Sequence, residues 1–65
     1  MEKRALWKLW QEAKRNLQYA QTYNYYRLER EAIEAYGRVA DAAEAAGCYR
    51  HSVYIDAWVH SGGMT

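Results

Sequence analysis

Residues 25–46 read YYRLEREAIEAYGRVADAAEAA, and small or apolar side chains recur in this segment at alternating steps of three and four residues. The recurring positions are Tyr25, Leu28, Ala32, Ala35, Val39, Ala42 and Ala46. This heptad spacing predicts a helix with one face that packs closely against another helix. A helix-pairing face does not indicate a substrate. The segment therefore predicts how the chain folds and that it functions by binding, but it does not predict a reaction.

A shorter seam of the same kind precedes this segment. Its positions, at steps of four and three, are Leu6, Trp10, Ala13, Leu17 and Ala20. The two seams are out of phase, because the first would continue at Asn24 whereas the second begins at Tyr25. Residues 21–24 have low helix propensity, and Thr22 or Asn24 could cap a second helix. We therefore expect a helical hairpin, with one long helix that absorbs the phase shift as the alternative.

The remaining boundaries follow from glycine positions and from the pattern near the end of the chain. The two expected helices cover about residues 2–21 and 25–46, and Gly47 is expected to end the second of them. The alternation through Val53 and its neighbours fits a strand as well as a helix. A lone strand would have no partner in a helical chain, so we favour a short helix over about residues 49–59.

The sequence thus predicts an all-α chain with one helical domain over residues 1–60 and a flexible C-terminal tail over residues 61–65. A 65-residue chain buries only about 60% of its unfolded surface. Cys48 is the only cysteine, which excludes a disulfide within the chain, and oligomerisation is another common source of stability. We expect a homodimer that approaches a four-helix bundle. Its expected self-association seam is Leu6, Trp10, Leu17, Leu28, Ala32, Ala35, Val39 and Ala42.

Charge and aromatic content both favour an interaction module. Residues 1–30 carry a net charge of +4 and residues 31–47 a net charge of −3, which suits antiparallel pairing of the two halves. The chain has three Trp and seven Tyr but no Phe, and Tyr and Trp are enriched at interfaces. We expect the partner surface to consist of tyrosines and tryptophans at the edge of the bundle.

Residues that could carry chemistry are few. Cys48, His51, Asp56 and His60 have metal-ligating side chains, but their spacing matches no standard zinc signature. A nucleophilic cysteine also needs a base and oxyanion donors held in a pocket, for which a helical hairpin offers little room. We therefore expect no enzyme activity, no cofactor and no metal.

Nucleic-acid binding is the alternative function. Basic side chains on the first helix, with aromatic residues nearby, could contact phosphates and stack on bases. The candidate contacts are Arg4, Lys8, Lys14 and Arg15. The net charge of +1 argues against this alternative.

Membrane association is not favoured. Trp7 and Trp10 lie beside basic residues, as in interfacial helices, but in a hairpin the same tryptophans would belong to the core. No apolar stretch approaches the length of a membrane span, and no signal-peptide core follows the charged start. Together with the single cysteine, these features predict a cytoplasmic protein.

The whole chain resembles a known group of proteins in its general type. A short helical chain rich in Trp and Tyr that opens Met1-Glu2-Lys3-Arg4-Ala5-Leu6-Trp7 resembles the small early accessory proteins of lambda-like temperate phages. This resemblance implies a non-enzymatic regulatory protein that binds host or phage factors in the host cytoplasm. It has no residue-level motif, so it assigns no site residues.

Overall fold

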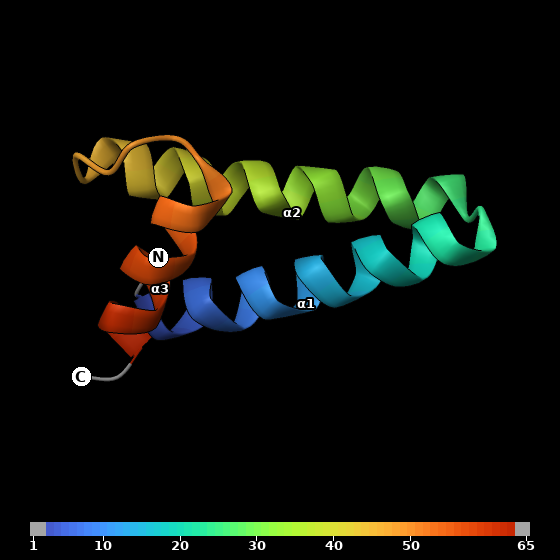
Figure 1. Cartoon of the computed structure of the whole chain (residues 1–65), viewed down its shortest axis with the longest axis horizontal. Coiled ribbons are helices and arrows are strands. Elements are labelled where there is room, and N and C mark those ends of the chain that lie inside the picture. Colours follow the sequence, from blue (N-terminus) through green and yellow to red (C-terminus); the bar gives the residue numbers. More distant parts are fainter. Residues whose placement is uncertain (1–2, 64–65) are drawn as a thin grey trace.

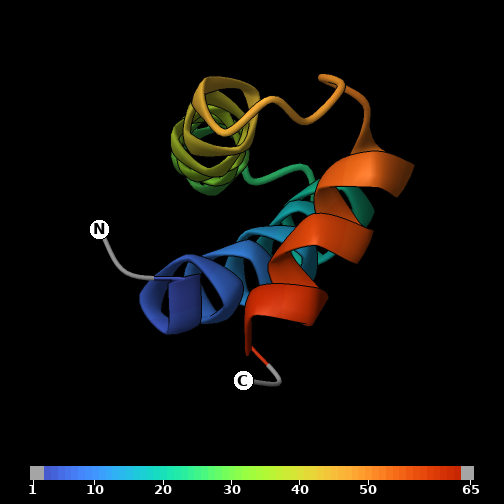
Figure 2. The same ribbon diagram turned by 90° about the vertical axis from the view of Figure 1, so that its left-hand side faces the viewer.

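The computed structural model describes residues 3–63, which form three helices and no strand. Helix α1 covers Lys3–Tyr23, α2 covers Tyr26–Ala45 and α3 covers Ser52–Gly63. As Figure 1 shows, α1 and α2 run antiparallel as a hairpin, and α3 crosses the hairpin near its open end. Figure 2 shows that α3 lies on one side of the hairpin only. The predicted all-α hairpin is confirmed, and the alternative of a single long helix is wrong.

The turn of the hairpin is shorter than the sequence suggested, because α1 continues to Tyr23. Asn24 adopts a positive φ of 58°, a conformation that asparagine tolerates better than most residues. The Tyr25 N–H then donates a hydrogen bond to the Ala20 carbonyl at 2.9 Å, which closes the end of α1. The prediction that Thr22 or Asn24 caps α2 was wrong. Tyr25 occupies the N-cap position without a side-chain hydrogen bond, and the Thr22 hydroxyl donates a hydrogen bond within α1.

The end of α2 agrees with the prediction. Gly47 has a φ of 90°, and its N–H donates to the Glu44 carbonyl at 2.9 Å. The Cys48 N–H donates to the Ala43 carbonyl at 2.9 Å, which completes a Schellman motif. Glycine is favoured here because a side chain is strained at this φ.

Helix α3 differs from the expected short helix at both ends. It begins at Ser52 rather than near residue 49, since residues 46–51 form a connecting loop. The His51 ring Nδ1 accepts a hydrogen bond from the Val53 N–H at 3.3 Å. This histidine therefore provides a partner for one of the free backbone N–H groups at the start of α3. The helix continues to Gly63, so part of the expected flexible tail is helical, whereas residues 1–2 and 64–65 lie outside the described part.

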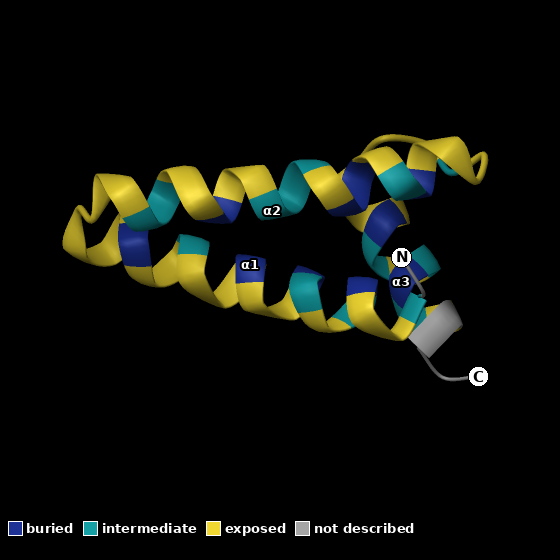
Figure 3. Cartoon of the chain, turned by 180° about the vertical axis from the view of Figure 1, so that it is seen from behind, coloured by how far each residue is buried: buried dark blue, intermediate teal, exposed yellow. Residues whose placement is uncertain are grey.

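The core is concentrated where all three helices meet. Its buried members are Leu6, Trp10, Val39, Ala40, Ala43, Ile55 and Val59. Toward the turn the buried residues are alanines, which let α1 and α2 approach closely without α3 (Figure 3). The large side chains therefore gather at the open end of the hairpin, where α3 covers them.

The predicted seam lies along this internal packing. Leu6, Trp10, Ala32 and Val39 are buried by contacts within one chain. The other four positions, which are Leu17, Leu28, Ala35 and Ala42, are half-buried. The seam thus holds the hairpin and α3 together, and its buried positions are not free to contact a second copy. The heptad pattern identified the face that packs within the chain, and self-association through this seam stays a prediction.

Candidate functional site

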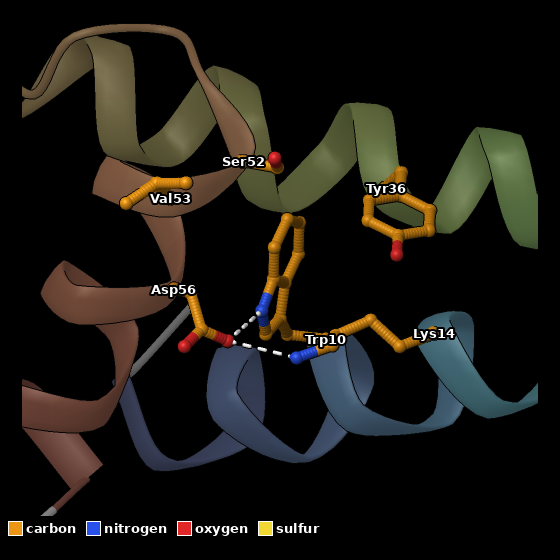
Figure 4. Close-up of a pocket in the computed structure, with 6 residues that line it drawn as sticks. All are labelled: Trp10, Lys14, Tyr36, Ser52, Val53 and Asp56. Atoms are coloured by element: carbon orange, nitrogen blue, oxygen red, sulfur yellow. Dashed lines mark hydrogen bonds and ion pairs between the residues drawn. The ribbon is translucent and has the colours of Figure 1, made fainter.

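A polar cluster joins α3 to α1 above the core. Asp56 lies on α3, and its Oδ1 accepts the indole N–H of Trp10 at 2.8 Å and a proton of the Lys14 ammonium at 3.0 Å (Figure 4). The His60 Nδ1 lies 3.4 Å from Oδ2 of the same carboxylate. The Tyr36 ring from α2 packs edge-on against Trp10, with ring centroids 4.6 Å apart. One carboxylate on α3 thereby fixes the orientation of the largest core side chain.

Electrostatics keep this carboxylate ionised. The hydrogen bond from Trp10, followed by that from Lys14, lowers the pKa of Asp56 below its usual value. Burial raises the pKa of the Tyr36 hydroxyl, so this group is neutral at physiological pH. The residues line a shallow cavity of about 340 Å³. Because Asp56 already accepts two donors and is a weak base, the cluster is suited to holding α3 in place rather than to moving protons.

Acid should therefore weaken the attachment of α3. Because the pKa of Asp56 is lower in the folded than in the unfolded chain, its stabilisation is complete above the unfolded pKa and is lost as pH falls through the folded pKa. Between about pH 5 and about pH 2, we expect the wild type to lose more unfolding free energy than the Asp56→Asn variant does. Urea denaturation at each pH measures this difference.

The matched control for acid sensitivity is Glu34→Gln. Glu34 is exposed and forms no ion pair with any residue of the described region. This variant should keep the acid sensitivity of the wild type. If Asp56→Asn shows the same acid loss as the wild type, the carboxylate does not hold α3 as we describe.

Apart from Asp56, which bonds to Trp10 and Lys14 of α1, the exposed surface of α3 has no formally charged side chain. Asp56 is the only Asp, Glu, Lys or Arg in this helix. Val53, which lines the same cavity as Asp56, is 66% exposed, Tyr54 is 57% exposed, and Ala57 is also exposed. Tyr49 from the preceding loop adds a ring 5.7 Å from that of Tyr54. We call these four residues the α3 outer face.

A second aromatic surface lies at the turn of the hairpin. The rings of Tyr19, Tyr23 and Tyr25 have centroids between 4.7 and 6.3 Å apart, and each side chain is at least half exposed. We call these three residues the tip tyrosines. The expected edge surface of tyrosines and tryptophans is thus made of tyrosines, because Trp10 is only 1% exposed and Trp7 and Trp58 pack against the core.

The four candidate nucleic-acid contacts separate into two groups. Arg4, Lys8 and Arg15 are exposed on α1 and form no ion pair with a residue in the range 3–63. Lys14 is also exposed, but it pairs with Asp56 of α3 and does not share their face. Sequence spacing placed Lys14 beside the other three, but it contained no sign of a carboxylate from a helix 42 residues away.

The candidate metal ligands do not assemble. Asp56 and His60 lie together, whereas the Cys48 thiol contacts the Tyr49 carbonyl at 3.5 Å and His51 is occupied at the start of α3. Among residues 3–63, no group of three or more His, Cys, Asp or Glu side chains is placed to hold a metal ion. None of the described helices is long and apolar enough to cross a bilayer.

Sequence reasoning missed the contact between Trp10 and Asp56. A buried indole N–H needs an acceptor, so a tryptophan within an apolar seam does indicate a polar partner. The pattern could not show which residue accepts, because the pair is 46 positions apart.

The fold and these surfaces define a small three-helix protein with a polar attachment for its last helix and exposed tyrosine surfaces. No family model, curated protein or solved structure matches the chain. The function therefore has to be inferred from the chain's own surfaces.

Proposed function

We propose that this chain is a non-enzymatic protein–protein interaction module that self-associates through the α3 outer face. The observation that supports the proposal is the exposure of Val53, Tyr54 and Ala57 on a helix whose only formally charged residue, Asp56, is engaged by Trp10 and Lys14 of α1. A helix that is apolar on both sides is usually covered on both sides. The hairpin covers one side of α3, and the proposed partner covers the other.

The absence of charge favours a second copy as this partner. In a two-fold symmetric interface, each patch faces the same patch of the other subunit, so charged side chains near the axis would oppose their own equivalents. The α3 outer face avoids this repulsion. Ala57 also allows close approach of two helices, while Tyr49 and Tyr54 supply aromatic contact area. Self-association would in addition stabilise a domain too small for a large core of its own.

A charge placed on the α3 outer face should prevent dimerisation. In the Ala57→Arg variant, two guanidinium groups would face each other across the two-fold axis, and we expect the dimer dissociation constant to rise at least about tenfold. The variant should stay folded, because Ala57 is exposed. Sedimentation equilibrium over a range of concentrations measures the change.

The matched control is Ala45→Arg, which adds the same charge at an exposed position near the end of α2. This variant should dimerise like the wild type. A wild-type chain that is monomeric at high micromolar concentration would refute self-association. Equal weakening by both arginines would show that net charge, rather than the α3 outer face, controls assembly.

The role of this module in a cell is a further part of the proposal. As an early accessory protein of a temperate phage, which the chain resembles in type, a dimer would bind host or phage factors and present each remaining surface twice. The two unassigned surfaces are the tip tyrosines and the basic side of α1.

A further inference from the structure

The outward side of α1 is positively charged along its first half. Arg4, Lys8 and Arg15 lie on one side of the helix, opposite the buried Leu6 and Trp10. At 1.5 Å per residue, they are separated by about 6 and about 10 Å along the axis. Their charges are not neutralised by ion pairs with described residues. The only acidic residue in α1 is Glu12, which lies on the same side between Lys8 and Arg15, so three positive charges there face one negative charge.

The tip tyrosines extend this surface toward the turn. Tyr19 follows Arg15 by about one helical turn, and Tyr23 follows Tyr19 by another. Tyr25 approaches from the far side of the turn, with its ring centroid 5.8 Å from that of Tyr19. The three rings lie next to one another and are each at least half exposed, so they present one cluster of aromatic faces to solvent.

We infer that Arg4, Lys8, Arg15 and the tip tyrosines together form a binding surface for single-stranded nucleic acid. Cations along a surface bind the phosphates of such a strand, and exposed aromatic rings stack on its bases. The bases of a duplex are already stacked on their neighbours, so rings of this kind favour an unpaired strand. The surface is separate from the α3 outer face and does not depend on self-association.

The combination of charge with rings favours this occupant over an acidic protein or a duplex. An acidic peptide would use the three cations, but it would gain little from a cluster of exposed aromatic rings. A duplex would likewise contact the cations through its phosphates and leave the tyrosines unused. Both alternatives predict that the tip tyrosines contribute nothing to affinity, which binding measurements can test directly.

Fluorescence anisotropy with a labelled oligothymidylate of about 12 nucleotides tests the inference, because single-strand site sizes fall near this length. We expect tighter binding to this strand than to a duplex of equal length. With three phosphate contacts, the affinity should fall about 20-fold between about 50 mM and about 200 mM salt. An acidic polyglutamate peptide should not compete effectively.

Paired variants separate stacking from charge. The Tyr19→Ala/Tyr23→Ala double variant should bind at least about fivefold more weakly. Tyr19→Phe/Tyr23→Phe should bind like the wild type, because it keeps the rings. The control Tyr49→Ala/Tyr54→Ala removes exposed tyrosines from the other surface and should not alter binding. Far-UV circular dichroism checks that each variant keeps its helices.

A matched pair also tests the cations. Lys8→Gln should lower the slope of log affinity against log salt by about 0.7, whereas Arg30→Gln, on the outer side of α2, should leave that slope unchanged. No binding at about 50 mM salt would overturn the inference, since three contacts should be detectable there. Equal affinity for single strand and duplex, or full binding by the Tyr19→Ala/Tyr23→Ala variant, would also overturn it.

Discussion

The Trp10→Ala variant is expected to be largely unfolded in water at room temperature. Trp10 is 1% exposed and is the largest fully buried side chain among the described residues. Removal of a buried Trp costs about 3–5 kcal/mol, and a core of this size rarely supplies more than about 5 kcal/mol in total. The variant also leaves Asp56 without its shorter hydrogen bond. Urea denaturation followed by far-UV circular dichroism measures the loss.

Two further tryptophan variants show which property of Trp10 matters. Trp10→Phe keeps most of the ring packing but removes the N–H, so we expect a loss smaller than that of Trp10→Ala. Trp7→Ala removes a half-buried ring that packs edge-on against His60, with ring centroids 6.0 Å apart. It should also lower the free energy of unfolding by less than Trp10→Ala does. If Trp10→Ala kept the wild-type midpoint, Trp10 would not hold the three helices together.

The second large effect is expected from Val59→Asp. Val59 is fully buried between α3 and the hairpin, and the new carboxylate would have no partner there. An uncompensated buried charge costs at least about 3 kcal/mol, so we expect α3 to detach and the chain to lose cooperative unfolding. The measurements are the urea midpoint and the wavelength of tryptophan emission, which should shift to the red as Trp10 and Trp58 become exposed.

Val53→Asp is the matched control, because it makes the same change six residues earlier in the same helix. Val53 is exposed, so its replacement should leave monomer stability within about 0.5 kcal/mol of the wild type. It places a charge on the α3 outer face and should therefore weaken self-association. Similar destabilisation by both variants would mean that α3 does not have the buried and exposed sides described above.

The hairpin could be predicted from the sequence, because heptad spacing indicates which side of a helix is buried. The phase break before Tyr25 and the glycine at position 47 placed the turn and the end of α2 to within a few residues. The spacing could not show whether a seam packs within one chain or between two. Leu6 and Val39, for example, satisfy the heptad rule equally well in a dimer seam and in the core that they form here.

The third helix was harder to predict for a physical reason. Val53 and Ala57 point outward while Ile55 and Val59 point inward, so apolar residues lie on both sides and the period is obscured. The attachment of α3 depends on Asp56, whose partners on α1 are distant in sequence. The same contact explains why Lys14 is absent from the basic surface. Pairings of this kind follow from tertiary packing and are not visible in local spacing.

The most direct test of the proposed interaction module is a dilution series of two-dimensional 15N–1H NMR spectra of the wild-type chain. We predict concentration-dependent amide shifts at Tyr49, Val53, Tyr54 and Ala57, with the amides of Ala35 and Ala42 unchanged. Shifts centred instead on Ala35 and Ala42 would place self-association on the heptad seam and contradict the proposed surface. Spectra that do not change with concentration would contradict self-association itself.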